Sequence, residues 1–212
     1  GNSDQVLVGD SVIAIGSPLG LSGTVTAGII SSKNRAVTTG NGFGESSFIN
    51  ALQTDAAINP GNSGGALVNE RGELVGINVA IATAGSGEAG SIGVGFAIPS
   101  NTANRIATEI MQTGKATHGL LGAMVRDNSE NGSGFSTGAY VDQVTEGGAA
   151  ESAGIQSGDV IIEFAGQKVT SAADLTAMVR AQPAGAEVDL KIVRDGETIS
   201  VQATLGNAED LN

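Results

Sequence analysis

Cysteine and tryptophan are absent from this 212-residue sequence, and histidine occurs once, as His118. A chain without cysteine forms no disulfide and no thiolate metal or redox site. A single histidine excludes a histidine-rich metal centre, so no metal and no other cofactor is expected. Aromatic residues make up only 3% of the chain. Any hydrophobic core should therefore consist mainly of valine, isoleucine, leucine and alanine.

Basic residues and long apolar runs are also scarce. Ten Lys and Arg stand against 22 Asp and Glu, which gives a formal net charge of −12. Nucleic-acid binding depends on clustered basic residues that displace counterions from phosphates, so this composition argues against it. No apolar run approaches the roughly 18 residues of a membrane-spanning helix. With 40% hydrophobic residues, the chain is expected to fold as one large or two small domains.

Glycine, by contrast, is abundant, with 33 residues that separate short segments rich in valine and isoleucine. Such punctuation marks tight turns, and β-branched runs between turns are typical of strands. Six strands without long helices between them favour an antiparallel barrel, because parallel strands need crossover connections of a dozen or more residues. The predicted strands are 11–16, 24–31, 48–54, 66–68, 74–81 and 92–98.

A helix is predicted directly after Pro99. Ser100 can cap its start, and Gly114 is a typical residue to end it. Apolar residues recur between them at the spacing of one buried helix face. They are Ala103, Ile106, Ala107, Ile110 and Met111.

The pattern changes near Thr117, which predicts a domain boundary between residues 1–116 and 117–212. Strands and short helices alternate in the second domain. Ser171, with Asp174 three residues later, resembles a capping box that opens a helix ending near Gln182. The predicted strands are 121–125, 139–144, 160–164, 188–192 and 199–203, and the last two form a hairpin around Asp195-Gly196.

The most informative stretch is Gly61-Asn62-Ser63-Gly64-Gly65. Glycines around a serine let the backbone approach a ligand closely, which suits acyl transfer, where backbone N–H groups must point at a developing oxyanion. A flexible turn between two strands would explain the same spacing. The stretch also fits the nucleophile elbow of α/β hydrolases, but that elbow needs a helix directly after the serine. Here a strand is predicted instead, which argues against an esterase-like hydrolase.

Several stretches together resemble the HtrA/DegP family of serine proteases, over essentially the whole chain. In the second half, 118–123 resembles a PDZ carboxylate-binding loop and 153–161 resembles the central PDZ motif of that family. The first-half stretches are 16–20, 24–31, 55–67 and 93–99. The resemblance implies a mainly β fold. Residues 1–116 would form the second, six-stranded antiparallel barrel of a chymotrypsin-like domain, and 117–212 an α+β PDZ domain.

The resemblance also implies roles for individual residues. Ser63 would be the nucleophile, and the amides of Gly61 and Ser63 would form the oxyanion hole. Substrate main chain would add as a strand at Asn78-Val79-Ala80. The primary specificity pocket would lie between that edge and the segment with Ala57 and Ile58, and it would accept small or medium aliphatic side chains because no charge lies there.

In the family, the histidine and aspartate of the catalytic triad come from a first barrel upstream of these residues. This chain would then hold one triad member of three and be inactive alone. Asp55 is interpreted as structural rather than as the triad acid, and His118 as an exposed residue of the PDZ loop.

The PDZ half is expected to bind peptide C-termini between its second strand and its long helix, with the terminal carboxylate at the amides of Leu121, Gly122 and Ala123. The resemblance implies a bacterial endopeptidase outside the cytoplasm, acting on unfolded or damaged proteins. Upstream residues could anchor it to a membrane and assemble it into a homotrimer. A non-catalytic PDZ scaffold remains the alternative function.

Overall fold

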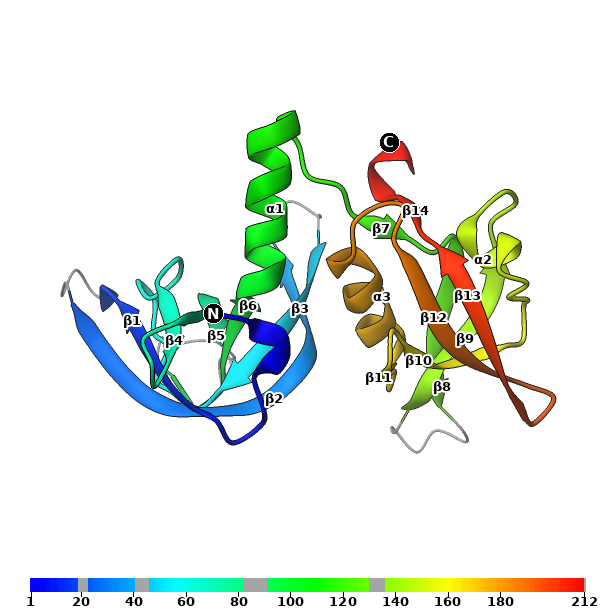
Figure 1. Ribbon diagram of the computed structural model, residues 1–212. Coiled ribbons are helices and arrows are strands. Elements are labelled where there is room, and N and C mark those ends of the chain that lie inside the picture. The colour runs from blue at the N-terminus through cyan, green and yellow to red at the C-terminus, as the bar shows by residue number, and fades with distance from the viewer. Residues whose placement is uncertain (19–22, 41–45, 82–90, 130–135, 212) are drawn as a thin grey trace. The chain divides into compact units, whose positions relative to one another are not determined.

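The computed structural model describes residues 1–18, 23–40, 46–81, 91–129 and 136–211 (Figure 1). The chain divides into two compact units, Gly1–Gly114 and Lys115–Asn212.

The first unit is a closed barrel of six strands in the order β1-β2-β3-β6-β5-β4, and every neighbouring pair is antiparallel (Figure 1). This confirms the predicted barrel. A short 3₁₀ helix, η1 (Ser3–Gln5), precedes it. The strands are β1 (Ser11–Gly16), β2 (Thr24–Gly40), β3 (Ser46–Thr54), β4 (Ala66–Asn69), β5 (Leu74–Ile81) and β6 (Gly95–Pro99).

The barrel interior is aliphatic, as the low aromatic content predicts. Buried side chains alternate along the strands with outward ones, so that Val12 and Ala14 of β1 point inward. Their partners in the core include Ile30, Leu52, Ile58, Leu67 and Val75. Ile58 belongs to this core although it lies in the loop after β3, which ties that loop to the barrel.

β2 is longer than predicted, because it continues to Gly40 instead of ending at residue 31. Residues 32–40 are mostly polar and lack the apolar alternation of a half-buried strand. They pair with β3 in a hairpin, after register shifts on either side of Ser32. Asn34 has a positive φ of 57° within this irregular stretch. β6, in contrast, starts later than predicted, because it begins at Gly95 rather than at residue 92.

α1 (Ser100–Thr113) follows β6 and ends at Gly114, as predicted. The N-cap is Pro99 and not Ser100, and no side chain caps this end. The predicted apolar face is only partly buried. The helix packs against β5 and β6, whereas near its C-terminal end Ile110 is 49% exposed and Met111 is 78% exposed.

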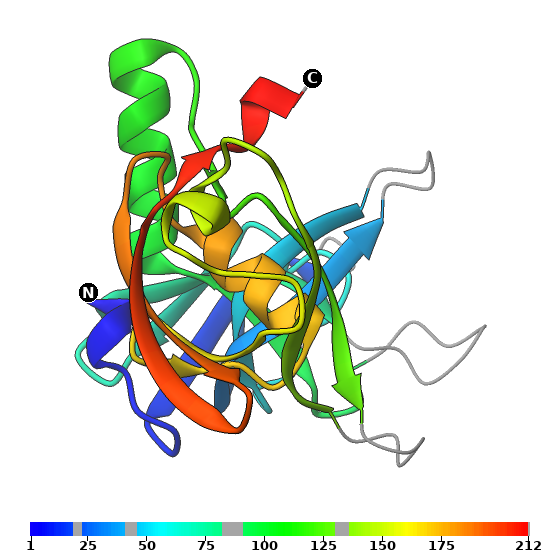
Figure 2. The same cartoon turned by 90° about the vertical axis from the view of Figure 1, so that its right-hand side faces the viewer.

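The second unit is a curved antiparallel sheet in the order β13-β12-β10-β9-β8, with β11 paired to β10 and a separate two-stranded sheet of β14 and β7. α3 packs against β7, β8 and β9 (Figures 1 and 2). The elements are β7 (Gly119–Leu120), β8 (Ala123–Ser129), β9 (Ser136–Val144), α2 (Ala149–Ser152), β10 (Val160–Phe164), β11 (Gln167–Lys168), α3 (Ala172–Ala181), β12 (Glu187–Arg194), β13 (Glu197–Thr204), β14 (Gly206–Asn207) and η3 (Ala208–Leu211).

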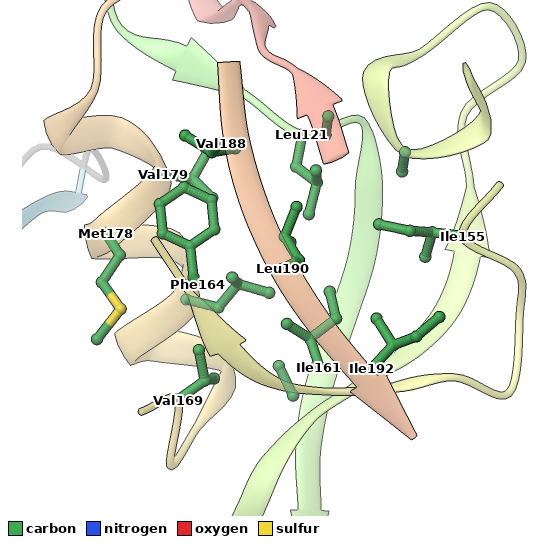
Figure 3. Packing of buried hydrophobic residues seen from close by; sticks show 14 of the residues in the cluster. Leu121, Ile155, Ile161, Phe164, Val169, Met178, Val179, Val188, Leu190 and Ile192 are labelled. Atoms are coloured by element: carbon green, nitrogen blue, oxygen red, sulfur yellow. The ribbon is translucent and has the colours of Figure 1, made fainter. Parts of the chain in front are cut away.

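The core of this unit gathers around Phe164, between α3 and the sheet (Figure 3). Phe164 and Met178 depart from the otherwise aliphatic composition. The predicted hairpin is confirmed: β12 and β13 pair in register from Glu187 to Arg194. Asp195 and Gly196 both have positive φ, at 52° and 83°, as a two-residue type I′ turn requires.

The predicted capping box at the start of α3 is half formed. The Ser171 hydroxyl accepts a hydrogen bond from the Asp174 amide at 3.0 Å. The Asp174 carboxylate does not return to Ser171 but accepts from the Thr170 amide at 3.2 Å. The reciprocal bond is thus displaced by one residue.

Candidate functional site

Ser63 lies in the loop that joins β3 to β4 and is exposed. Its hydroxyl donates a hydrogen bond to the Val79 carbonyl oxygen at 3.2 Å. Val79 lies where the pairing of β5 with β6 shifts register, between Asn78 and Ala80. The structure therefore brings the predicted nucleophile into contact with the predicted substrate-binding segment, Asn78-Val79-Ala80, which lies within β5.

The backbone N–H groups around Ser63 alternate between bonded and unbonded. Within the described part of the chain, the amides of Gly61 and Ser63 donate no hydrogen bond. Their neighbours are all engaged: the amides of Asn62, Gly64 and Gly65 donate to Asn59, Asn78 and Asn62 carbonyls at 2.9, 2.7 and 2.9 Å. Two unbonded donors thus flank the exposed hydroxyl, on the residues predicted to form the oxyanion hole.

Two glycines hold this loop against β1 and the residue that follows it, at distances that admit no side chain. Gly61 has a φ of +102°, and a Cβ there would lie 2.6 Å from the Ser17 carbonyl oxygen. A Cβ on Gly65 would lie 2.1 Å from the Ile15 carbonyl oxygen. Both neighbours are backbone atoms, so the glycines are required by close approach and not only by turn geometry.

Two buried asparagines support the motif from inside the barrel. Asn62 is 2% exposed and Asn78 is 1% exposed. The Asn62 side-chain amide donates to the Ala57 carbonyl oxygen at 3.4 Å, and that of Asn78 donates to the Ala66 carbonyl oxygen at 3.1 Å. Neither Oδ1 atom has a hydrogen-bond partner. Sequence reasoning assigned no supporting role to Asn62, because the pattern of glycines does not reveal what an intervening polar side chain contacts.

β2 supports the same loop from its other side. The Thr26 hydroxyl donates to the Ala57 carbonyl oxygen at 2.9 Å. The Asp55 carboxylate accepts a hydrogen bond from the Ile29 amide at 2.7 Å, and a Cβ on Gly28 would lie only 2.4 Å from that carboxylate. Asp55 therefore ties the start of the loop to β2, which is a structural role.

The residues predicted for the specificity pocket divide into two groups. Ile58 and Asn78 point into the barrel, where Ile58 is 1% exposed. They can shape a pocket only through their backbone. Ala57 is half-buried, and its carbonyl oxygen accepts the bonds described above. Val79 is the member of the set that directly contacts Ser63.

In the second unit, the predicted carboxylate loop has a comparable arrangement of free donors. The Leu121 carbonyl oxygen accepts from the Ala150 amide at 2.7 Å, and that of Gly122 accepts from the Thr145 amide at 2.8 Å. The amides of Leu121 and Gly122 donate no hydrogen bond to any described residue. The loop is therefore held by its carbonyl groups and leaves its N–H groups available. Ala123 follows as the first residue of β8.

A cavity of about 170 Å³ lies between β8 and α3, beside this loop. β8 is the last strand of the sheet, so one of its backbone edges is open to an added strand. Leu121, Ala123 and Leu175 line the cavity, whereas Met178 does not. Leu121, Leu175 and Met178 all belong to the buried core of this unit.

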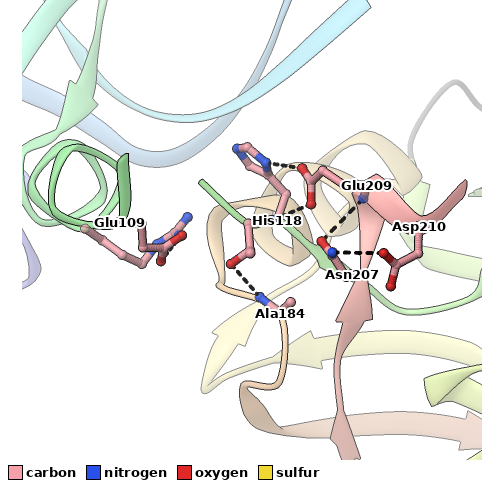
Figure 4. A network of polar contacts seen from close by, with 8 residues as sticks. Glu109, His118, Ala184, Asn207, Glu209 and Asp210 are labelled. Carbon is pink, nitrogen blue, oxygen red and sulfur yellow. Dashed lines mark hydrogen bonds and ion pairs between the residues drawn. The ribbon is translucent and has the colours of Figure 1, made fainter. Parts of the chain in front are cut away.

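His118 joins the start of β7 to η3 (Figure 4). Its Nδ1 lies 2.7 Å from Glu209 Oε1, its amide donates to Glu209 Oε2 at 3.2 Å, and its carbonyl oxygen accepts from the Ala208 amide at 2.8 Å. Burial raises the pKa of Glu209, but the hydrogen bonds from the ring and the amide of His118 outweigh it, so that the pKa lies below its usual value. His118 was predicted to be exposed but is half-buried, because its ring lies against Glu209.

Asp159, in the stretch 153–161 that resembles the central PDZ motif, forms a bidentate ion pair with Arg194 of β12. Asp159 is 1% exposed. Its two carboxylate oxygens each lie 2.7 Å from Arg194, one from Nε and one from Nη2, and the Gln156 amide donates to Oδ2 at 2.8 Å. Burial raises the pKa of Asp159. These hydrogen bonds and the Arg194 charge lower it by more than burial raises it, so the pKa lies below its usual value.

Among the described residues, no three His, Cys, Asp or Glu side chains lie close enough together to hold a metal ion. No helix within those residues is both long enough and apolar enough to cross a bilayer.

Comparison with known proteins gives two family matches. Residues 1–77 match the trypsin-like peptidase domain, and residues 110–193 match the PDZ domain. Serine protease PepD of Mycobacterium tuberculosis is 49% identical over 215 residues, covering 99% of this chain and 45% of PepD. Periplasmic serine endoprotease DegP of Escherichia coli is 43% identical over 209 residues, covering 96% of this chain and 42% of DegP.

Solved structures agree with these matches. The HtrA-type protease AlgW, determined with a tripeptide, superposes with a TM-score of 0.63 at 36% identity. The match covers 98% of this chain and 68% of that one. The chain spans less than half the length of the two curated relatives.

Proposed function

Because this chain belongs to the HtrA family of serine proteases, we propose that it supplies the nucleophile-bearing barrel and one PDZ domain of an endopeptidase. The observation that carries this proposal is the exposed Ser63 hydroxyl between two unbonded amides, those of Gly61 and Ser63. In acyl transfer, the hydroxyl oxygen attacks the scissile carbonyl carbon, and the carbonyl oxygen becomes an oxyanion that two such donors stabilise. Loss of one donor of this kind typically costs about 10²–10³ in rate.

A base is needed for this reaction, because a serine hydroxyl is almost fully protonated at neutral pH and is a poor nucleophile. Within the described residues, the only hydrogen-bond partner of the Ser63 hydroxyl is the Val79 carbonyl, which cannot take its proton. We expect the histidine and aspartate to come from residues upstream of this chain. The 212 residues alone are then expected to be inactive.

Substrate would bind as an extended strand beside Val79. A peptide amide that bonds to the Val79 carbonyl would replace the hydrogen bond from Ser63 and place the scissile bond at the hydroxyl. No charged side chain is among the residues proposed for the specificity pocket, which favours small or medium aliphatic residues before the scissile bond. The second unit would bind peptide C-termini in the groove between β8 and α3.

The cellular setting is proposed from the relatives. DegP is named a periplasmic endoprotease, which supports a location outside the cytoplasm. We propose unfolded or damaged polypeptides as substrates, a homotrimer as the assembled state and, through upstream residues, attachment to a membrane.

Labelling with a fluorophosphonate probe tests the role of Ser63. We expect no labelling of the 212-residue chain. The protein extended at its N-terminus to the length of its relatives should be labelled, and Ser63→Ala should abolish the labelling. Ser157→Ala is the matched control, because it removes an exposed hydroxyl in the second unit and should leave labelling unchanged. Intact mass spectrometry reports the adduct.

Two outcomes would contradict the proposal. Labelling of the extended protein that persists in Ser63→Ala would place the nucleophile elsewhere. Absence of labelling from the extended protein, together with binding of C-terminal peptides, would favour the alternative function of a non-catalytic PDZ scaffold. That alternative draws support from the Ser63 hydroxyl, which bonds to a backbone carbonyl and not to a base.

A further inference from the structure

Arg180 lines the proposed peptide groove between β8 and α3, at the end of the groove nearest to Leu121 and Gly122. Among the described residues that line this groove, it is the only one with an ionisable side chain. It lies in the last turn of α3 and is exposed. Arg126 and Arg194 of the same unit are paired with Asp142 and Asp159. Arg180, in contrast, has no hydrogen bond or ion pair with any residue that the structure describes.

The surroundings of this groove end would repel an anion if Arg180 were neutral. The last carbonyl groups of α3 lie directly at the loop: a Cβ on Gly119 would be 2.6 Å from the Val179 carbonyl oxygen, and the Gly119 amide donates to the Gln182 carbonyl oxygen at 2.8 Å. The C-terminus of a helix carries partial negative charge. Residues 115–212 also contain 14 acidic and only six basic residues. A peptide carboxylate here therefore meets an unfavourable background potential.

The unbonded amides of Leu121 and Gly122 offset part of this repulsion, and the guanidinium of Arg180 at the same cavity, unpaired among the described residues, can offset more. We propose that Arg180 is a second anchor for the peptide carboxylate, so that the ligand is a free C-terminus with an apolar last residue. The apolar side chain would occupy the cavity between Leu121, Val125 and Val179. The guanidinium and the loop amides would then bind opposite sides of one carboxylate, as charge-assisted donors do.

This inference rests on the proposed peptide binding by the second unit and deepens it. It predicts discrimination against internal segments and against C-terminal amides, because neither carries the charge that Arg180 would pair with. It also predicts that binding weakens with salt, since an exposed ion pair is screened.

The test uses the 212-residue chain and a pool of uncharged octapeptides with free C-termini that end in Val, Leu, Ile or Phe. The tightest binder is resynthesised as its C-terminal amide, and both forms are titrated by fluorescence anisotropy. For Arg180→Gln we expect the acid to bind about fivefold more weakly, as for a partly exposed ion pair, and the amide to bind as it does to the wild type. Arg180→Lys should retain most of the preference for the acid.

Lys168→Gln is the matched control, since it removes one positive charge from an exposed residue of β11 that does not line the groove. An unchanged ratio of acid to amide affinity in Arg180→Gln overturns the role of Arg180 while leaving peptide binding intact. An equal effect in Lys168→Gln overturns it too, because the effect would then come from net charge. If no peptide of the pool binds, or if the wild type binds acid and amide alike, the proposed carboxylate recognition itself fails.

Discussion

Asp159→Asn is expected to destabilise the second unit by about 3 kcal/mol, the lower end of the cost of breaking a buried ion pair from one side. The substituted amide would retain the shape of the carboxylate but present N–H donors to the N–H donors of Arg194. Arg194 would then keep its charge without its partner. The lower end applies because the Arg194 side chain is 27% exposed and can reach water.

Tyr140 makes this prediction easy to measure, since it is the only tyrosine of a chain without tryptophan. It lies in β9, with Arg126 4.0 Å from its ring centroid, so its fluorescence in a urea titration reports the second unit alone. Glu163→Gln is the control, because it breaks the more exposed pair with Lys191, for which about 0–1 kcal/mol is expected. Equal midpoints for the two variants would contradict the assigned role of Asp159.

The same ion pair predicts a pH dependence. The pKa of Asp159 is depressed in the folded state, so the unfolded chain binds this proton more readily. The pair therefore contributes its full stabilisation above the unfolded-state pKa, which is about 3.9, and loses it as the pH falls through the lower folded-state pKa. The difference between wild type and Asp159→Asn should be constant from pH 7 to pH 5 and shrink below about pH 4. A difference that grows on acidification would contradict this sign.

Elements with a strong local pattern could be predicted from the sequence. The strands at 11–16, 74–81 and 160–164 have the predicted bounds, because their apolar runs are bounded by turn residues. The extension of β2 through residues 32–40 was not predictable in this way. Its polar residues gain strand structure only by pairing with β3, and a pairing partner distant in sequence leaves no local periodicity.

The candidate sites show the same difference between features with a local sequence pattern and features that depend on residues distant in sequence. The glycines around Ser63 pointed to a close backbone approach, since no other residue serves that purpose as well. The contacts of Asn62, Asn78 and Asp159 depend on neighbours from other strands, so their burial and partners emerge only in the folded chain. The same holds for Arg180, which the helical pattern places at the end of α3 but not beside Leu121 and Gly122.

Gly65→Ala is expected to destabilise the first unit by about 3 kcal/mol, the upper end of the usual cost of overpacking. The new Cβ would lie 2.1 Å from the Ile15 carbonyl oxygen and 2.9 Å from that of Asn62. Both are backbone atoms, and the Gly65 amide and carbonyl are themselves bonded to Asn62 and Asn78. The clash can be relieved only by moving the Ser63 loop away from β1, which would also displace the two unbonded amides.

Gly64→Ala is the matched control for Gly65→Ala. Gly64 has a φ of +83° and open space around its added Cβ, so the expected cost is about 1–2 kcal/mol of backbone strain without a clash. Hydrogen exchange measured by mass spectrometry separates the two, because Gly65→Ala should accelerate exchange in both β1 and β4, whereas Gly64→Ala should affect mainly the loop. If β1 exchanged equally in both variants, the close approach of Gly65 to Ile15 would not be what holds the Ser63 loop in place.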